Sequence, residues 1–129
     1  MIYEYENGMR AFARSMRHAF RGLRHAFLRE RNFQIELGLA ILSIALAFAL
    51  PLTQGERALI LLLIAVVLPM ELFNTACERI VDMLKPGLHP YAKMVKDLTA
   101  AAVLIASLLA GIIGISIFLP YVAEVLFAK

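Results

Sequence analysis

The stretch MELFNTACERIVD, residues 70–82, places polar side chains at the end of a long apolar run. It directly follows the segment ALILLLIAVVLP, residues 58–69. A charged side chain in hydrocarbon costs about 2.5 kcal/mol or more, so a chain keeps one there only where it has a partner, water or a task. The polar positions of the stretch fall at i, i+3, i+7 and i+11, which lie on one face of a helix. They are Glu71, Asn74, Glu78 and Asp82.

The composition around this stretch is that of a membrane protein. The chain has 129 residues, of which 61% are hydrophobic, whereas soluble domains are about 45–50% apolar. Its apolar runs approach the ~20 residues that a transmembrane helix needs, and strand-like alternation is absent, which leaves helices. The sequence therefore predicts an all-α membrane protein with a single domain, residues 1–129. We expect a surface helix at 1–33 and transmembrane helices at 34–52, 57–82 and 97–120, the last one ending at Pro120.

The basic residues predict how the chain is oriented. Seven of the thirteen Lys and Arg residues precede residue 35, and others flank the connection at 83–96. By the positive-inside rule, the N-terminus and this connection are expected in the cytoplasm and the C-terminus outside. The opening MIYEYENG has no basic or apolar signal-peptide region, so we expect the apolar runs to be permanent spans. The single cysteine, Cys77, excludes an intramolecular disulfide.

The N-terminal segment carries two stripes at helical spacing. Its arginines are spaced 4, 3, 4 and 3 residues apart, and a second stripe is apolar. This pattern predicts a basic amphipathic helix lying on a membrane surface. Two roles remain open for it, an anchor to anionic lipid or a contact with substrate phosphates. The stripes are Arg10, Arg14, Arg17, Arg21 and Arg24, and Phe12, Met16, Phe20, Leu23 and Phe27.

Several parts of the chain place polar groups at one depth in the membrane. Glu71 lies fourteen residues after Arg57, or about 21 Å along a helix axis, which puts it in the cytoplasmic third. Residues that flank the other spans reach the same depth. The full set is Glu30, Glu36, Glu71, Asn74, Glu78, Asp82, Lys96 and Asp97.

This polar set has the groups that phosphoryl transfer needs. Carboxylate and amide oxygens bind Mg²⁺ together with substrate phosphate, a lysine binds phosphate oxygens, and a carboxylate can take a proton from a lipid hydroxyl. The sequence contains neither GxxxxGK[ST] nor GxGxxG, so any nucleotide site must be of an unusual type.

Residue chemistry alone leaves three classes of protein open. The first is an enzyme. The second is a small ion or proton carrier, although a carrier places its charges near the midplane and these charges gather at one face. The third is a structural subunit whose carboxylates pair with Lys96 or Arg79.

A resemblance to a known family favours the enzyme. The segments ELFNTACERIVD and HPYAKMVKDLTAAAVLI, with RSMRHAFRGLRHAFLRERNFQIE upstream, resemble the bacterial membrane-integral lipid kinases, which include diacylglycerol kinase and undecaprenol kinase. The resemblance covers about Ser15 to Ile113. It implies a homotrimer in the bacterial cytoplasmic membrane, with active sites at subunit interfaces. ATP and Mg²⁺ would come from the cytoplasm and a lipid substrate from the bilayer, and no nucleic-acid partner is expected.

The resemblance also implies roles for individual residues. Glu71 would be the general base on the lipid hydroxyl, and Mg²⁺ would be held by Glu30 and Glu78. The nucleotide phosphates would be bound by Asn74, Lys96 and Asp97. The surface helix would approach the nucleotide with Arg14, His18 and Arg21. Supporting polar positions would be Glu36 and Asp82.

The lipid substrate is less sharply indicated. The forms NTA, HPYAKMVKD and RSMRHAFRG are more similar to undecaprenol kinases, whereas Glu36 in FQIE is more similar to diacylglycerol kinases. We favour undecaprenol, with diacylglycerol as the alternative. Arg79 departs from the small or apolar residue of the family, and could pair with Asp82 or perturb the metal carboxylate. In the last span, the small residues Ala106, Ala110 and Gly114 predict close helix packing.

Overall fold

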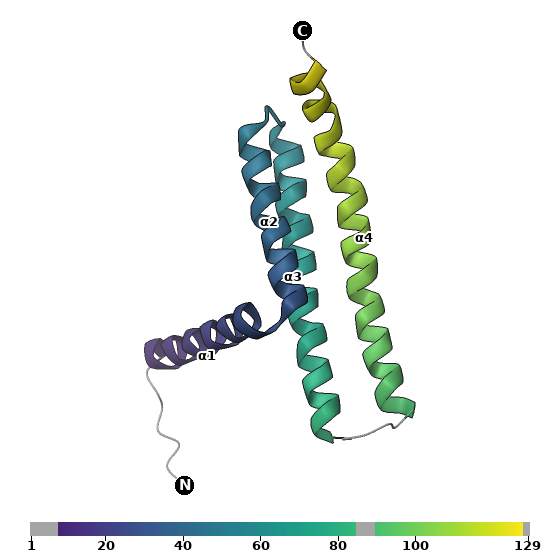
Figure 1. Ribbon diagram of the computed structural model, residues 1–129. Coiled ribbons are helices and arrows are strands. Elements are labelled where there is room, and N and C mark those ends of the chain that lie inside the picture. Colours follow the sequence, from purple (N-terminus) through teal and green to yellow (C-terminus); the bar gives the residue numbers. More distant parts are fainter. Residues whose placement is uncertain (1–7, 85–89, 128–129) are drawn as a thin grey trace.

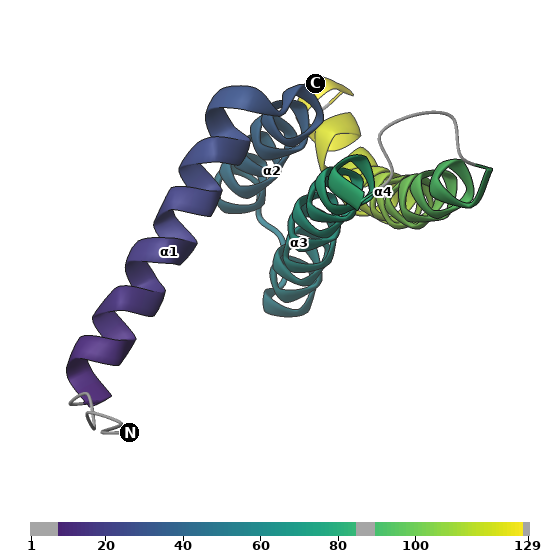
Figure 2. The same cartoon turned by 90° about the horizontal axis from the view of Figure 1, so that it is seen from below.

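The computed structural model describes residues 8–84 and 90–127, which form four helices joined by short connections. The helices are α1 (Gly8–Arg29), α2 (Arg31–Ala49), α3 (Gln54–Leu84) and α4 (Pro90–Phe127). Three helices, α2, α3 and α4, stand side by side, and α1 projects from the lower end of α2, partway along α3 and α4 (Figure 1). The view from below shows that α1 extends away from the other three (Figure 2). By length and composition α2, α3 and α4 can each cross a membrane, which confirms the predicted all-helical class.

An elbow at Glu30 separates α1 from α2. Its backbone is extended, with φ −107° and ψ 107°, so one residue interrupts the helical path. Both flanking turns stay bonded, because the Glu30 N–H donates to Ala26 at 2.9 Å and the Glu30 carbonyl accepts from Gln34 at 3.1 Å. The predicted surface helix at 1–33 therefore ends earlier, and residues 31–33 belong to α2. The elbow sets the direction in which the arginine-rich helix leaves the bundle.

The opposite end of the bundle is closed by polar contacts at the α2–α3 turn. Thr53 and Glu56 form a capping box, in which the Thr53 N–H donates to Glu56 at 2.8 Å and the Glu56 N–H donates to Thr53 Oγ1 at 3.3 Å. The Tyr121 hydroxyl of α4 donates to the same Glu56 carboxylate at 2.7 Å. Arg57 Nε donates to the Ala47 carbonyl at 3.0 Å. These bonds surround a small buried cluster of Ala47, Leu52 and Ile60.

Two helices continue through a proline. Pro69 lies inside α3 and Pro120 inside α4. The last span was predicted to end at Pro120, but the helix continues to Phe127. A proline removes one helical hydrogen bond, and packing by neighbouring helices can compensate. Here Phe118 and Tyr121, on either side of the proline, pack against the buried cluster at the α2–α3 turn.

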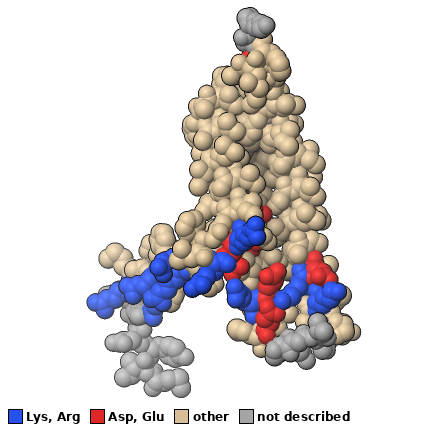
Figure 3. Space-filling model, viewed as in Figure 1, with Lys and Arg blue, Asp and Glu red and all other residues tan. Residues whose placement is uncertain are grey.

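The apolar and charged side chains are segregated along the bundle. Most large apolar side chains face outward, and α4 has no buried residue among those described. Uncharged surface covers most of the upper part of the face in Figure 3, whereas Lys and Arg lie along α1, and charges of both signs gather in the lower part. Outward apolar surface is expected where the surroundings are lipid or another membrane helix. The base of the bundle is therefore where polar chemistry can take place.

Candidate active site

Two polar residues are buried about midway along α3. Glu71 is 3% exposed and Asn74 is 6% exposed. Asn74 Nδ2 donates to Glu78 Oε1 at 3.5 Å, one turn further along. Among the described residues, Asn74 Oδ1 has no hydrogen-bond partner. A buried polar atom without a partner costs about 1–3 kcal/mol, so this oxygen marks a place where a further group can bind.

Three carboxylates surround Glu71 and form with it a cluster of four. The charges of Glu36, Glu78 and Glu30 all act on the Glu71 carboxylate, and the Asn32 side chain lies beside it. The elbow supplies Glu30, α2 supplies Glu36, and α3 supplies Glu71 and Glu78. Like charges at short distance repel one another. The cluster therefore favours binding of a cation.

Glu30, one of the two proposed metal carboxylates, forms an ion pair with Arg79. Arg79 Nη2 lies 2.6 Å from Glu30 Oε1, although 49 residues separate the two in the chain. His25 Nε2 lies 3.9 Å from the same oxygen. Of the two alternatives predicted for Arg79, the ion pair with Asp82 is not formed between these described residues. Instead, the arginine bonds to one of the two proposed metal carboxylates.

The remaining predicted residues are not among the groups that act on Glu71. Lys96 Nζ of α4 lies 2.6 Å from Asp82 Oδ1, and Asp97 is exposed. Helix α1 carries Arg14, His18 and Arg21, which are also exposed. Two carboxylates thus pair with cations, as the structural-subunit alternative required. Glu36 and Glu71 are in no ion pair within the described ranges.

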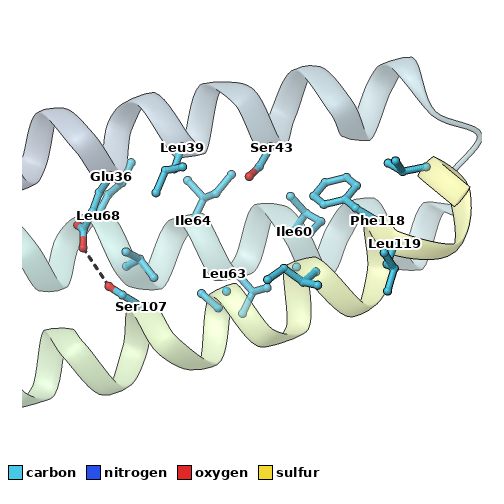
Figure 4. Close-up of a pocket in the computed structure, with 17 residues that line it drawn as sticks. Glu36, Leu39, Ser43, Ile60, Leu63, Ile64, Leu68, Ser107, Phe118 and Leu119 are labelled. Atoms are coloured by element: carbon cyan, nitrogen blue, oxygen red, sulfur yellow. Dashed lines mark hydrogen bonds between the residues drawn. The ribbon is translucent and has the colours of Figure 1, made fainter. Parts of the chain in front are cut away.

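A cavity of about 500 Å³ opens between α2, α3 and α4. Figure 4 shows its apolar side chains and, at one end, the hydrogen bond between Glu36 and Ser107. Its polar lining consists of Glu36, Ser43 and Ser107. Among the described residues, Glu36 Oε2 has no hydrogen-bond partner. The cavity therefore joins an apolar slot to the carboxylate cluster.

Ser107 was not among the site residues predicted from the sequence, and the small residues near it do not pack closely within this chain. A lone serine in the apolar run VLIASLLAG was the available signal. Ala110 and Gly114, which were predicted to pack closely, line the cavity instead. A Cβ atom added at Gly114 would meet no atom within 4 Å.

The donor set at the base of the bundle fits a hydrated or phosphate-bound Mg²⁺. No group of three His, Cys, Asp or Glu side chains is arranged to hold a metal within residues 8–84 and 90–127. Mg²⁺ usually takes only one or two carboxylates, with water and phosphate as its other ligands. Glu30, Glu78 and the unpartnered oxygen of Asn74 offer this chemistry.

Comparison with known proteins identifies the family. The model of the prokaryotic diacylglycerol kinase family matches residues 17–118. The chain belongs to this family of lipid kinases.

The chain is 38% identical to the undecaprenol kinase of Bacillus subtilis over 91% of this chain and 95% of that protein. It is 37% identical to a diacylglycerol kinase of Synechocystis over 82% of this chain and 61% of that protein. A diacylglycerol kinase of Pseudomonas aeruginosa is 30% identical over 78% of this chain and 82% of its own length. This assignment identifies the chain as an enzyme and not as a carrier or a structural subunit.

Proposed function

We propose that this lipid kinase uses ATP and Mg²⁺ to phosphorylate undecaprenol, giving undecaprenyl phosphate. The observation that carries the proposal is the burial of Glu71 where the carboxylate cluster meets the inner end of an apolar cavity. The similarity to the Bacillus subtilis undecaprenol kinase over nearly both full lengths supports this substrate. The alternative substrate is diacylglycerol, which is supported by the similarity to the diacylglycerol kinases of Synechocystis and Pseudomonas aeruginosa.

The proposed reaction begins with the lipid hydroxyl beside Glu71. The Glu71 carboxylate accepts the hydroxyl proton. The lipid oxygen then forms a bond to the γ-phosphorus of ATP, the bond to the bridging oxygen breaks, and ADP leaves. Mg²⁺, which Glu30 and Glu78 would hold, neutralises phosphate charge when bound.

Other polar residues would bind the nucleotide. Asn74 and Lys96 offer hydrogen-bond donors to the phosphates, and Asp97 would organise the nucleotide site. The Lys96–Asp82 ion pair holds the lysine at the base of α4, which is the supporting role we assign to Asp82. On α1, Arg14, His18 and Arg21 would approach the nucleotide from the surface helix.

The cavity supports a lipid with one long chain. Its lining is apolar apart from Glu36, Ser43 and Ser107. An isoprenoid alcohol needs hydrogen-bond partners only at its hydroxyl, whereas the two ester groups of a diglyceride need further donors. We infer that the chain of the alcohol occupies this cavity and that its hydroxyl lies at the Glu36 end, near Glu71.

The proposal also includes the assembly and its orientation. We propose a homotrimer in the bacterial inner membrane, with the N-terminus in the cytoplasm and α1 on the membrane surface. The outward apolar side chains of α4 support contact with other chains or with lipid. The concentration of basic residues on α1 and at the base of the bundle supports the orientation (Figure 3).

A radiolabel transfer assay tests the proposed substrate. Purified protein in mixed micelles would receive labelled ATP with undecaprenol or diacylglycerol, with and without Mg²⁺. We expect Mg²⁺-dependent transfer of label to undecaprenol. Preferential transfer to diacylglycerol would support the alternative, and transfer to neither lipid by folded protein would contradict both.

A further inference from the structure

The ion pair between Arg79 and Glu30 occupies a carboxylate that the proposed function assigns to Mg²⁺. The Arg79 side chain is 62% exposed, whereas the Glu30 side chain is 20% exposed. Glu30 is also held by its place in the elbow, where both neighbouring helical turns remain bonded. The arginine is therefore the member of the pair that is free to move.

The carboxylate cluster explains why a cation lies at this position. Glu30 and Glu78 both act on the charge of Glu71, and Arg79 interacts with Glu30, Glu78 and Asp82. A guanidinium that bonds to one of these carboxylates reduces their mutual repulsion. The guanidinium thus supplies the positive charge that a metal ion would supply when bound.

We propose that Arg79 is a placeholder cation, which holds Glu30 in the nucleotide-free enzyme and transfers to the ATP phosphates when Mg²⁺ and ATP bind. The inference rests on the proposed function. A metal ion at Glu30 competes with Arg79 for the same carboxylate. A guanidinium released there is free to bind another anion, and Asp82 is already paired with Lys96 at 2.6 Å. The phosphates are the remaining partner, and the planar guanidinium can donate two parallel hydrogen bonds to them.

Two binding measurements with opposite expected signs test this exchange. The first is binding of Mn²⁺ alone to nucleotide-free protein in micelles, followed by electron paramagnetic resonance of the free ion. The second is equilibrium binding of ATP in the presence of Mg²⁺. In Arg79→Ala, we expect Mn²⁺ alone to bind roughly fivefold more tightly, because a competing ion pair is lost. We expect ATP to bind about tenfold more weakly, because a charged phosphate contact is lost.

Two further variants separate this role from a purely structural one. Arg79→Lys keeps the charge without the planar fork, so Mn²⁺ affinity should stay near that of the unchanged protein while ATP binding weakens. Lys93→Ala removes one exposed positive charge near the N-terminal end of α4 and should alter neither the Mn²⁺ affinity nor the ATP affinity. The proposal is overturned if Arg79→Ala leaves both affinities unchanged, or weakens both together with a lowered unfolding temperature.

The Mn²⁺ titration needs neither lipid nor turnover. Tighter Mn²⁺ binding by Arg79→Ala would therefore support the placeholder role even if no label reached either lipid. Transfer of label to undecaprenol, with unchanged Mn²⁺ and ATP affinities in Arg79→Ala, would support the proposed function and reject the placeholder role.

Discussion

Ser107 of α4 donates a 2.9 Å hydrogen bond to Glu36 of α2, although 71 positions separate the two residues in the chain. The bond lies at the Glu36 end of the cavity, where the apolar lining meets the carboxylate cluster (Figure 4). It fixes one oxygen of Glu36 and leaves the other without a partner among the described residues. The proposed lipid hydroxyl would bind at this free oxygen, close to Glu71.

Ser107→Ala should weaken both the bundle and lipid binding. A hydrogen bond to a charged group contributes about 1.5–3 kcal/mol, and its loss leaves Glu36 with no described partner. We expect a lower unfolding temperature in detergent and a higher KM for the lipid. Ser116→Ala is a matched control, because the bond that Ser116 makes among the described residues is to the Ile113 carbonyl of its own helix. Equal effects of the two variants would contradict the role of the Glu36–Ser107 bond.

Glu71→Gln should abolish turnover while leaving the protein folded and able to bind ATP. The amide keeps the shape of the side chain but cannot accept the hydroxyl proton, and such proton transfers contribute about 10²–10⁴-fold to rate. Single-turnover label transfer and ATP binding would be measured on the same preparation. Glu124→Gln changes an exposed glutamate near the C-terminal end of α4 and should retain full activity. A near-normal kcat for Glu71→Gln would remove the base assignment.

Glu78→Ala should raise the Mg²⁺ concentration needed for activity. The substitution removes one proposed metal carboxylate and also the partner of Asn74 Nδ2. Activity would be measured against Mg²⁺ concentration at saturating ATP, with Mn²⁺ binding as a second measurement. Glu78→Asp, which keeps the charge, should show a smaller increase. An unchanged Mg²⁺ dependence in Glu78→Ala would place the metal elsewhere.

Gly114→Leu should exclude the lipid chain from the cavity without disturbing the bundle. Gly114 lines the cavity, and a Cβ added there meets no atom within 4 Å. We expect a higher KM for undecaprenol and an unchanged affinity for ATP. Gly38→Leu adds the same side chain to an exposed position on α2 outside the cavity lining and serves as the control. If both variants kept the original lipid KM, the lipid chain would have to lie outside this cavity.

Much of the polar site could be anticipated from residue spacing, but its connections could not. The face with Glu71, Asn74 and Glu78 follows from the helical period, which places side chains three, four and seven residues apart on one side. The pair Arg79–Glu30 joins α3 to the elbow, and the pair Lys96–Asp82 joins α4 to α3. Charge alone allowed several partners for each cation, so the choice depended on how the helices pack.

The sequence by itself determined the helical class and the number of helices able to cross a membrane. Apolar length sets both, because backbone polar groups in lipid must be satisfied within each helix. Only the tertiary structure decided the elbow at Glu30, the cavity between α2, α3 and α4, and the bond from Glu36 to Ser107. All three features depend on the directions of the helices and on how the helices pack. Hydrophobic pattern constrains neither of those quantities, because many arrangements bury the same apolar faces.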